Sequence, residues 1–222
     1  MIRHIPRWIL VGTVLLAAVA GFINTVGLLG IDQRPLSYMT GNLTLVGVGV
    51  SSGDGNAAYL AGMLVLLFLA GATLCGFIVQ QSTLKVGRRY GAVLSIESAL
   101  LFMAALLLDR GTASGAWAAA MACGLQNAMV TTYSGAIIRT THMTGVTTDL
   151  GIAMGHWLRG EQVEARRFLL LGCLLGGFVL GAVLGTLGYR HWGCLALLLP
   201  AGTTGVMGVA YFIYAQRHRQ MM

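Results

Sequence analysis

The sequence predicts an all-α integral membrane protein, because the chain is strongly apolar, nearly uncharged and organised in long apolar stretches. Of its 222 residues, 56% are hydrophobic, 9% are charged and 32 are Gly. A soluble domain usually carries about 25% charged residues, so this composition excludes a soluble enzyme and a nucleic-acid-binding protein. The net charge of +7 fits loops that face an anionic membrane leaflet.

Six apolar stretches are long enough to cross a bilayer, which takes about 20 residues. The first follows Arg3 and Arg7 in the manner of a signal peptide, but it is long enough to span and we expect it to be retained. Two shorter stretches are rich in Gly and Thr, and we predict that they are re-entrant half-helices, with thin spans as the alternative. The long stretches cover residues 8–31, 57–80, 90–108, 115–138, 167–189 and 192–215, and the short ones cover 36–51 and 141–157.

The distribution of Lys and Arg separates these two topologies, because cytoplasmic loops carry the excess of basic residues. Eight spans would place eight basic residues inside and six outside. Six spans with two re-entrant segments place eleven inside and three outside, with both termini in the cytoplasm. The outside residues are then Arg34, Arg110 and Arg190, and the inside ones are Arg3, Arg7, Lys85, Arg88, Arg89, Arg139, Arg159, Arg166, Arg167, Arg217 and Arg219.

Two blocks of residues recur in the same order about 100 positions apart. Gly21–Asn24 recurs as Gly124–Asn127 with an offset of 103, and the segment beginning Met39-Thr40-Gly41 recurs from Met143 with an offset of 104. We therefore predict a single membrane domain over residues 1–222, with a first repeat at 1–110 and a second at 111–222. Because each repeat crosses the membrane three times, the second repeat has the opposite orientation to the first. Such inverted repeats are common among secondary transporters.

The residues of these blocks resemble the signature of the YoaK-type membrane proteins, the family called domain of unknown function 1275. The resemblance covers nearly the whole chain and implies a bacterial inner-membrane protein of permease type. Many members have Asp where this chain has Asn24, so a mechanism that needs a charge at that position is not carried over. The matching residues are Gly21–Asn24, Met39–Asn42, Gly124–Ala128, Arg139–Thr141, Met143–Gly145 and Asp149–Gly151.

Polar residues of the repeated blocks are the candidate solute site. Short, Gly-interrupted segments at matching positions of two repeats point to a binding site, and the N-terminal end of a half-helix carries partial positive charge. Such ends suit an anion or a neutral polar solute. The alternative for the amides is a structural role in hydrogen bonds between helices. The candidates are Asn24, Thr40, Gly41, Asn42, Gln126, Asn127, Thr144, Gly145 and Thr148.

Two carboxylates fall within the apolar stretches and are candidates for proton coupling, because an ionisable group at membrane depth is costly. Glu97 lies in the 90–108 stretch, where a hydrogen bond to a neighbouring helix is the structural alternative. Asp149 shares a helical face with His142 and His156, and the alternative there is a salt bridge to an Arg such as Arg139. Successive members of that face are about 10 Å apart, too far to share a metal ion, so we predict no metal and no cofactor.

These features favour a transporter or channel for a small polar or anionic solute, with proton coupling as an option, over two other classes. An accessory subunit that packs through Gly-rich helices is the runner-up. An enzyme is least favoured, because the chain has no HExxH, Gly-x-Ser-x-Gly or paired-carboxylate motif. A seam of small residues favours contact inside the bundle, with a homodimer as the alternative; it consists of Gly177, Gly181 and Gly185.

If the two Met-Thr-Gly segments approach each other closely, replacing the glycine of either segment by a residue with a bulky side chain is expected to be poorly tolerated. These glycines are Gly41 and Gly145, whereas Gly53, in the polar loop over residues 51–56, is expected to tolerate a bulky side chain.

Overall fold

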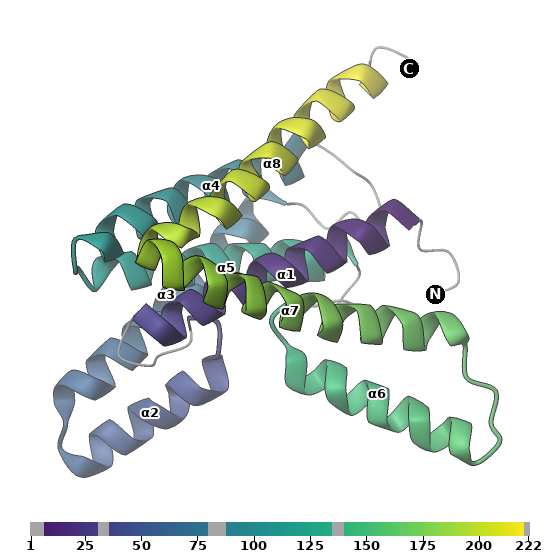
Figure 1. Cartoon of the computed structure of the whole chain (residues 1–222), viewed down its shortest axis with the longest axis horizontal. Helices are drawn as coiled ribbons and strands as arrows, with labels where there is room; N and C mark the ends of the chain where they lie inside the picture. The colour runs from purple at the N-terminus through teal and green to yellow at the C-terminus, as the bar shows by residue number, and fades with distance from the viewer. Residues whose placement is uncertain (1–6, 31–35, 80–87, 135–139, 220–222) are drawn as a thin grey trace.

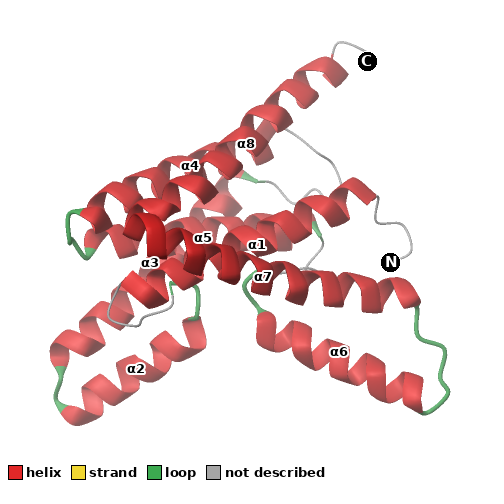
Figure 2. Ribbon diagram, viewed as in Figure 1, coloured by secondary structure: helices red, strands yellow, loops and turns green. Residues whose placement is uncertain are grey.

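The computed structural model describes residues 7–30, 36–79, 88–134 and 140–219, and within these ranges the chain forms helices and no strand (Figure 1, Figure 2). The predicted all-α class is confirmed, and each predicted apolar stretch corresponds to a helix. The helices are α1 (Arg7–Gly30), α2 (Met39–Ser52), α3 (Gly55–Ile78), α4 (Arg88–Asp109), α5 (Ser114–Tyr133), α6 (Met143–Leu158), α7 (Ala165–Trp192), the short 3₁₀ helix η2 (Gly193–Leu197) and α8 (Leu198–Arg219).

Four segments of the described chain are long and apolar enough to cross a membrane. They are Val11–Gly30, Gly55–Ile78, Arg89–Asp109 and Ala165–Tyr214, the last of which contains both α7 and α8. Helix α5 is not among them, although the sequence analysis expected a span there. Nearly every side chain between Ala116 and Leu125 is buried, so α5 is enclosed by other helices. A helix with so little lipid contact does not need a continuously apolar surface.

Helices α1 and α7 pack closely and run in the same direction. A Cβ added at Gly177 would lie 2.9 Å from the carbonyl oxygen of Val14, and one at Gly185 would lie 2.8 Å from that of Phe22. Between these points a Cβ at Gly181 would meet the carbonyl of Ala18. The seam of Gly177, Gly181 and Gly185 therefore lies inside the bundle against α1, as predicted.

Helices α3 and α5 also run in the same direction. The rings of Tyr59 and Trp117 make an edge contact with centroids 6.3 Å apart, and roughly two to three turns further along each helix, a Cβ at Gly71 would lie 3.0 Å from the amide nitrogen of Leu125. Helices α4 and α8, in contrast, are antiparallel. Ser98 donates a hydrogen bond of 2.7 Å to the carbonyl of Ala201 near the start of α8, whereas Gly91 near the start of α4 lies against Gly208.

The contacts between α1 and α7 recur between α5 and α3 at equivalent positions. A Cβ on Gly21 would meet the carbonyl of Phe178, and a Cβ on Gly124 would meet that of Phe68. In the same way, a Cβ on Gly181 would meet the carbonyl of Ala18, and a Cβ on Gly71 would meet the carbonyl of Met121. The offsets are 103 residues for α1 and α5 and 110 residues for α3 and α7, so a third pair of similar blocks, Phe68–Gly71 and Phe178–Gly181, accompanies the two found by sequence.

Helices α2 and α6 are shorter than the others, with 14 and 16 residues. At 1.5 Å per residue they are about 21 and 24 Å long, less than the hydrocarbon thickness of about 30 Å. Figure 1 shows α2 folded back along α3 and α6 folded back along α7, so that two hairpins project from the same side of the molecule. Both short helices begin toward the middle of the molecule and end toward opposite sides of it (Figure 1).

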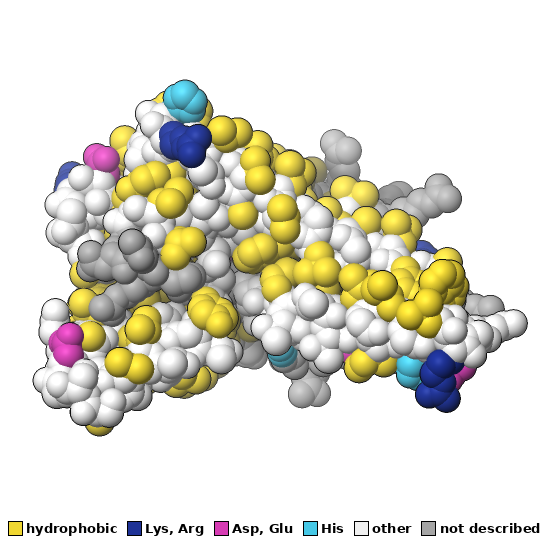
Figure 3. All heavy atoms as spheres, turned by 60° about the horizontal axis from the view of Figure 1, so that its bottom comes forward, with side chains coloured by type: hydrophobic (Ala, Val, Ile, Leu, Met, Phe, Trp, Pro, Cys, Tyr) yellow, Lys and Arg dark blue, Asp and Glu magenta, His cyan; other side chains and the backbone are white. Residues whose placement is uncertain are grey.

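Charged side chains on the face shown in Figure 3 gather mainly toward two opposite ends, with a largely hydrophobic or uncharged surface between them. One end carries Asp54, Asp109, Arg110 and Arg190, near the turns that precede α3 and α5 and the end of α7. The other carries Arg159, Glu161, Glu164, Arg166 and Arg167, around the turn between α6 and α7. An uncharged belt between charged ends is the surface expected of a protein embedded in a bilayer.

Candidate functional site

The two short helices, α2 and α6, begin with the same local structure. Tyr38 precedes α2 with φ −90° and ψ 75°, and His142 precedes α6 with φ −93° and ψ 58°. A Cβ on Gly41 would meet the ring of Tyr38, and a Cβ on Gly145 would lie 3.0 Å from the ring of His142. The glycine of each Met-Thr-Gly segment therefore makes room for the aromatic ring three residues earlier, a role that the sequence analysis did not anticipate.

Gly53, in contrast, has a φ of 74°, a left-handed conformation that side-chain-bearing residues rarely adopt. A side chain at Gly53 therefore adds backbone strain that the sequence analysis did not consider, and whether Leu there leaves folding and activity intact stays a prediction. No neighbouring atom lies within 4 Å of the place its Cβ would occupy, so the constraint comes from the backbone and not from packing.

Each short helix carries a stripe of exposed polar or small residues at the same positions. Thr44 donates to the carbonyl of Thr40 at 2.9 Å, and Thr148 donates to that of Thr144 at the same distance. The spacing of four, three and four residues places each set on one helical face. The two stripes consist of Thr40, Thr44, Gly47 and Ser51 in α2 and of Thr144, Thr148, Gly151 and Gly155 in α6, all exposed. Lipid tails offer no hydrogen bonds, so these faces suit water or a polar solute.

The amides near the repeat have different partners in the two halves. The Oδ1 of Asn24 accepts hydrogen bonds from the backbone amide and the hydroxyl of Ser37, both at 3.0 Å, which ties α1 to the chain that leads into α2. Gln126 donates to the carbonyl of Leu16 at 2.7 Å and to the hydroxyl of Thr140 at 3.4 Å. Within the described residues, the buried Oδ1 of Asn127 and Oε1 of Gln126 accept no hydrogen bond. Asn42 is also buried.

Asp149 lies on the exposed face of α6, with its carboxylate 3.9 Å from the guanidinium of Arg167 on α7. The partner considered in the sequence analysis, Arg139, lies outside the described residues. His156 contacts Glu161 at 2.7 Å, and Glu161 also contacts Arg159 at 3.2 Å. In the described part of the chain, no group of three or more His, Cys, Asp or Glu is placed to hold a metal ion.

Glu97 is completely buried in α4. Neither carboxylate oxygen has a hydrogen-bond partner among the described residues. The two serines beside it are engaged elsewhere, because Ser95 donates to the carbonyl of Gly91 and Ser98 donates to that of Ala201. The structural alternative of a hydrogen bond from Glu97 to a neighbouring helix therefore has no counterpart within the described ranges.

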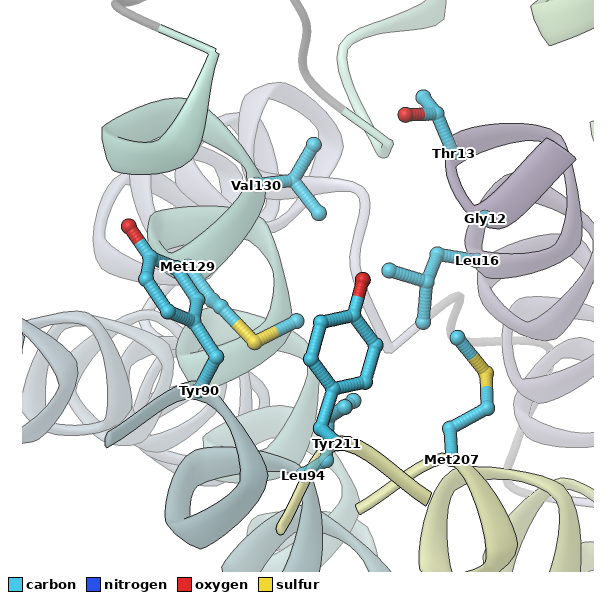
Figure 4. Close-up of a pocket in the computed structure, with 9 residues that line it drawn as sticks. All are labelled: Gly12, Thr13, Leu16, Tyr90, Leu94, Met129, Val130, Met207 and Tyr211. Atoms are coloured by element: carbon cyan, nitrogen blue, oxygen red, sulfur yellow. The ribbon is translucent and has the colours of Figure 1, made fainter. Parts of the chain in front are cut away.

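A cavity of about 40 Å³ lies between α1, α4, α5 and α8 (Figure 4). The sequence analysis did not identify it, although Tyr90, Leu94 and Glu97 follow one another at helical spacing and share a face of α4. The cavity lies at the ends of these helices that include the start of α1 and the end of α8. Its lining consists of Gly12, Thr13, Leu16, Tyr90, Leu94, Met129, Val130, Met207 and Tyr211.

Comparisons with known proteins identify the family to which the chain belongs. A family model described as "Protein of unknown function (DUF1275)" matches residues 12–210. The UPF0700 transmembrane protein RA0705 of Rhizobium meliloti (strain 1021) is 29% identical over 219 residues, which cover 93% of this chain and 89% of that protein. No solved structure matches the chain. The family model covers most of the chain, including both Met-Thr-Gly segments, and the chain therefore belongs to the DUF1275 family of membrane proteins.

Proposed function

We propose that this protein is a transporter or channel for a small polar or anionic solute, and that α2 and α6 form the solute path. The observation that carries the proposal is the matched pair of short helices, which begin toward the middle of the molecule with the same arrangement of a ring over a glycine. The N-terminal end of each helix presents partial positive charge and unpaired amide groups. Two such ends offer an attractive environment for an anion or a polar solute.

The directions of the long helices support a topology of six spans with α2 and α6 as re-entrant half-helices. With neither short helix crossing, α1 and α7 cross in one direction, α3 and α5 cross in the other, and α4 opposes α8, in agreement with their packing. If both short helices crossed, α4 and α8 would run in the same direction. If only one crossed, α1 and α7 would oppose each other. The second repeat is then inverted relative to the first.

The positive-inside rule sets the orientation that we propose for this topology. Arg89, Arg159, Arg166 and Arg167 then lie on the cytoplasmic side, and Arg110 and Arg190 lie on the outer side. Both termini are cytoplasmic in a bacterial inner membrane. Several other basic residues used in the sequence argument, among them Arg3, Arg34, Lys85 and Arg139, lie outside the described residues.

Proton coupling through Glu97 completes the proposal. An ionisable side chain inside a span is costly, and Glu97 has no hydrogen-bond partner among the described residues that would offset the cost. This favours a carboxyl that exchanges a proton during transport over a structural hydrogen bond. Asp149 is the weaker candidate, because its carboxylate is exposed and lies near Arg167.

The topology is tested by cysteine labelling in cells, in a variant whose four native cysteines are replaced by Ala. Cysteine at Ser52 or Ser114 is expected to react with an impermeant maleimide from the periplasm, and cysteine at Gln162 only after the cytoplasmic side is opened. Reaction of Gln162→Cys from the periplasm would contradict the topology.

The activity is tested by uptake of small anions and polar solutes into proteoliposomes across an imposed pH gradient. We expect uptake of at least one solute class, lost on introducing Leu at Gly145, and we expect Glu97→Gln to remove the pH dependence while the protein stays folded. Unchanged uptake and an unchanged pH profile in Glu97→Gln would assign Glu97 a structural role.

A further inference from the structure

We propose that the cavity between α1, α4, α5 and α8 is the cytoplasmic entry route by which a small monovalent cation, the proton included, reaches Glu97, and that Leu16, Leu94 and Met207 form the gate of this route. The inference rests on the proposed function for its orientation and purpose. The arrangement of the cavity, the gate and the carboxyl is a property of the fold itself.

The cavity lining carries hydroxyl groups at one end and is apolar at the other. Thr13, Tyr90 and Tyr211 contribute hydroxyl groups; Figure 4 shows the two tyrosine hydroxyls pointing upward in the view and Thr13 lying near its top. Leu94 and Met207 lie at the opposite end (Figure 4). A volume of about 40 Å³ has room for two or three water molecules, since each needs roughly 10–15 Å³ of such space and a few polar partners.

Glu97 lies one layer beyond the apolar end. On α4, Tyr90, Leu94 and Glu97 share a face, and Glu97 is about 4.5 Å further along the helix axis than Leu94. On α8, Tyr211 and Met207 share a face with Thr204, which is buried.

The register between α4 and α8 brings these layers to the same depth. The helices are antiparallel, and a Cβ at Gly208 would lie 2.9 Å from the hydroxyl of Ser95, while one at Gly205 would lie 2.8 Å from that of Ser98. The order from the cavity mouth inward is therefore a layer of tyrosines, a layer of Leu94 and Met207, and a layer of Glu97 and Thr204.

The apolar layer acts as a gate because water does not cross a narrow hydrophobic constriction readily. Leu16 and Leu94 are buried, and Met207 adds an unbranched, adaptable side chain that changes position at low cost. Gln126 braces this layer by donating its amide to the carbonyl of Leu16, and its buried Oε1 has no hydrogen-bond partner in the described chain.

The surroundings of Glu97 suit a cation. The thiol of Cys123 on α5 lies near Glu97, and Tyr90 on α4 and Tyr211 on α8 lie in the outermost layer. Glu97 has no ion-pair or hydrogen-bond partner in the described ranges, so an arriving cation meets a carboxyl that no neighbouring group has already engaged.

The proposal is tested by carboxyl modification of the full-length protein in lipid nanodiscs, which needs neither a known solute nor transport. A water-soluble carbodiimide with a small amine reaches Glu97 only where water does, and peptide mass spectrometry reports the modified fraction at each carboxyl. The rate at Glu97 is divided by the rate at the exposed Glu161 of the same sample, which removes the intrinsic pH dependence of the reagent.

We expect Glu97 to react slowly in the wild type and about fivefold faster or more in Leu94→Ala and in Met207→Ala, since either change removes part of the constriction. Leu184→Ala, on the exposed face of α7, is the matched control and is expected to leave the rate unchanged. Equal rates at Glu97 and Glu161 in the wild type would overturn the gate. Unchanged rates in both folded gate variants would overturn the entry route.

The identity of the cation is tested in Leu94→Ala at constant ionic strength, with Met207→Ala as the second background. Slower reaction of Glu97 in sodium chloride than in choline chloride indicates a metal cation, and a normalised rate that changes between acidic and neutral buffer without a sodium effect indicates the proton. A normalised rate that responds to neither overturns cation binding at Glu97. Failure of every uptake assay would count against the transporter but would leave this result standing.

Discussion

The two halves of the chain share their backbone geometry but differ in their polar chemistry. Gly21 and Gly124 make equivalent backbone contacts with α7 and α3, and Gly41 and Gly145 each accommodate an aromatic ring. The polar groups do not follow this equivalence. Asn24 accepts two hydrogen bonds where Asn127 accepts none within the described residues, and α2 has Leu45 where α6 has Asp149.

The two halves therefore share the glycine positions that allow close helix packing. They do not share the same set of polar side chains and hydrogen bonds. Close approach of helices requires glycine at particular positions in both halves, because any side chain would strike a carbonyl group. No such requirement acts on the exposed faces of α2 and α6, where the two halves share a stripe of Thr and Gly residues but differ at Leu45 and Asp149. A solute path built from both halves is therefore chemically asymmetric, with the pair of Asp149 and Arg167 in the second half.

The largest expected effect tests the equivalence of the two helix crossings. Gly21→Ala and Gly124→Ala are each expected to destabilise the protein by about 3 kcal/mol, because the added methyl group meets a backbone carbonyl that has little freedom to move. Thermal unfolding in detergent measures both. Gly172→Ala, with no atom near its added Cβ, is the control and is expected to unfold like the wild type. A large loss in one variant alone would break the equivalence.

The next effect compares the starts of the two half-helices. Gly41→Ala is expected to cost about 2 kcal/mol and Gly145→Ala less than about 1 kcal/mol, since the ring of Tyr38 lies closer to the added methyl group than the ring of His142 does. The measurement is again thermal unfolding, with Gly47→Ala and Gly151→Ala as controls in open positions. The reverse order of the two costs would show that Tyr38 moves aside more easily than His142.

A smaller effect separates the two asparagines. Asn24→Ala leaves the amide and the hydroxyl of Ser37 without an acceptor and is expected to cost about 1–2 kcal/mol. Asn127→Ala removes an oxygen that accepts no hydrogen bond in the described structure, so a change within about 0.5 kcal/mol is expected. Denaturant or thermal unfolding distinguishes the two. Equal losses would place an unseen partner, such as water, on Asn127.

The smallest effect on stability is expected for the charged residue that distinguishes α6 from α2. Asp149→Leu, which gives α6 the residue found at the equivalent position of α2, is expected to change stability by less than about 1 kcal/mol, because the pair with Arg167 is exposed and 3.9 Å long. Unfolding at low and high salt measures this. Asp149→Asn keeps the size of the side chain and serves as the control in uptake assays, where loss of activity without loss of stability would assign Asp149 to the path.

The class, the helix positions and the family could be predicted from the sequence because each rests on a local signal. Long apolar stretches separated by charged turns define the helices, and the Met-Thr-Gly segments define the repeat. The pairing of α1 with α7 and of α3 with α5 rests on long-range contacts, and only the blocks Phe68–Gly71 and Phe178–Gly181 carry a sequence signal for it. The similarity of these two blocks is recognised only once α3 and α7 are known to be equivalent.

The candidate site was predicted in part. Burial of Glu97 followed from its place in an apolar stretch, but the cavity beside it depends on side chains from four helices, and no local pattern reports how these meet. The exposure of Asp149 could not be predicted from the sequence either, because it depends on how α6 packs. One face of α6 contacts α7 and the other face is left exposed. The role of Gly53 was missed because a left-handed backbone is not visible in the composition of a polar loop.

The pairing of helices across the two halves has a consequence for how the protein is made. Gly21 meets Phe178, which follows it by 157 residues, whereas Phe68 meets Gly124 after only 56. At about 5–20 residues per second, the ribosome delivers α5 to α3 roughly 3–11 s after α3 is complete, but α7 reaches α1 only after about 8–30 s. During that interval α1 lacks the α7 partner that covers Gly21 in the folded protein. Helix α1 is the first helix made, and in this period it is most open to cleavage by a membrane protease and to association with a wrong partner.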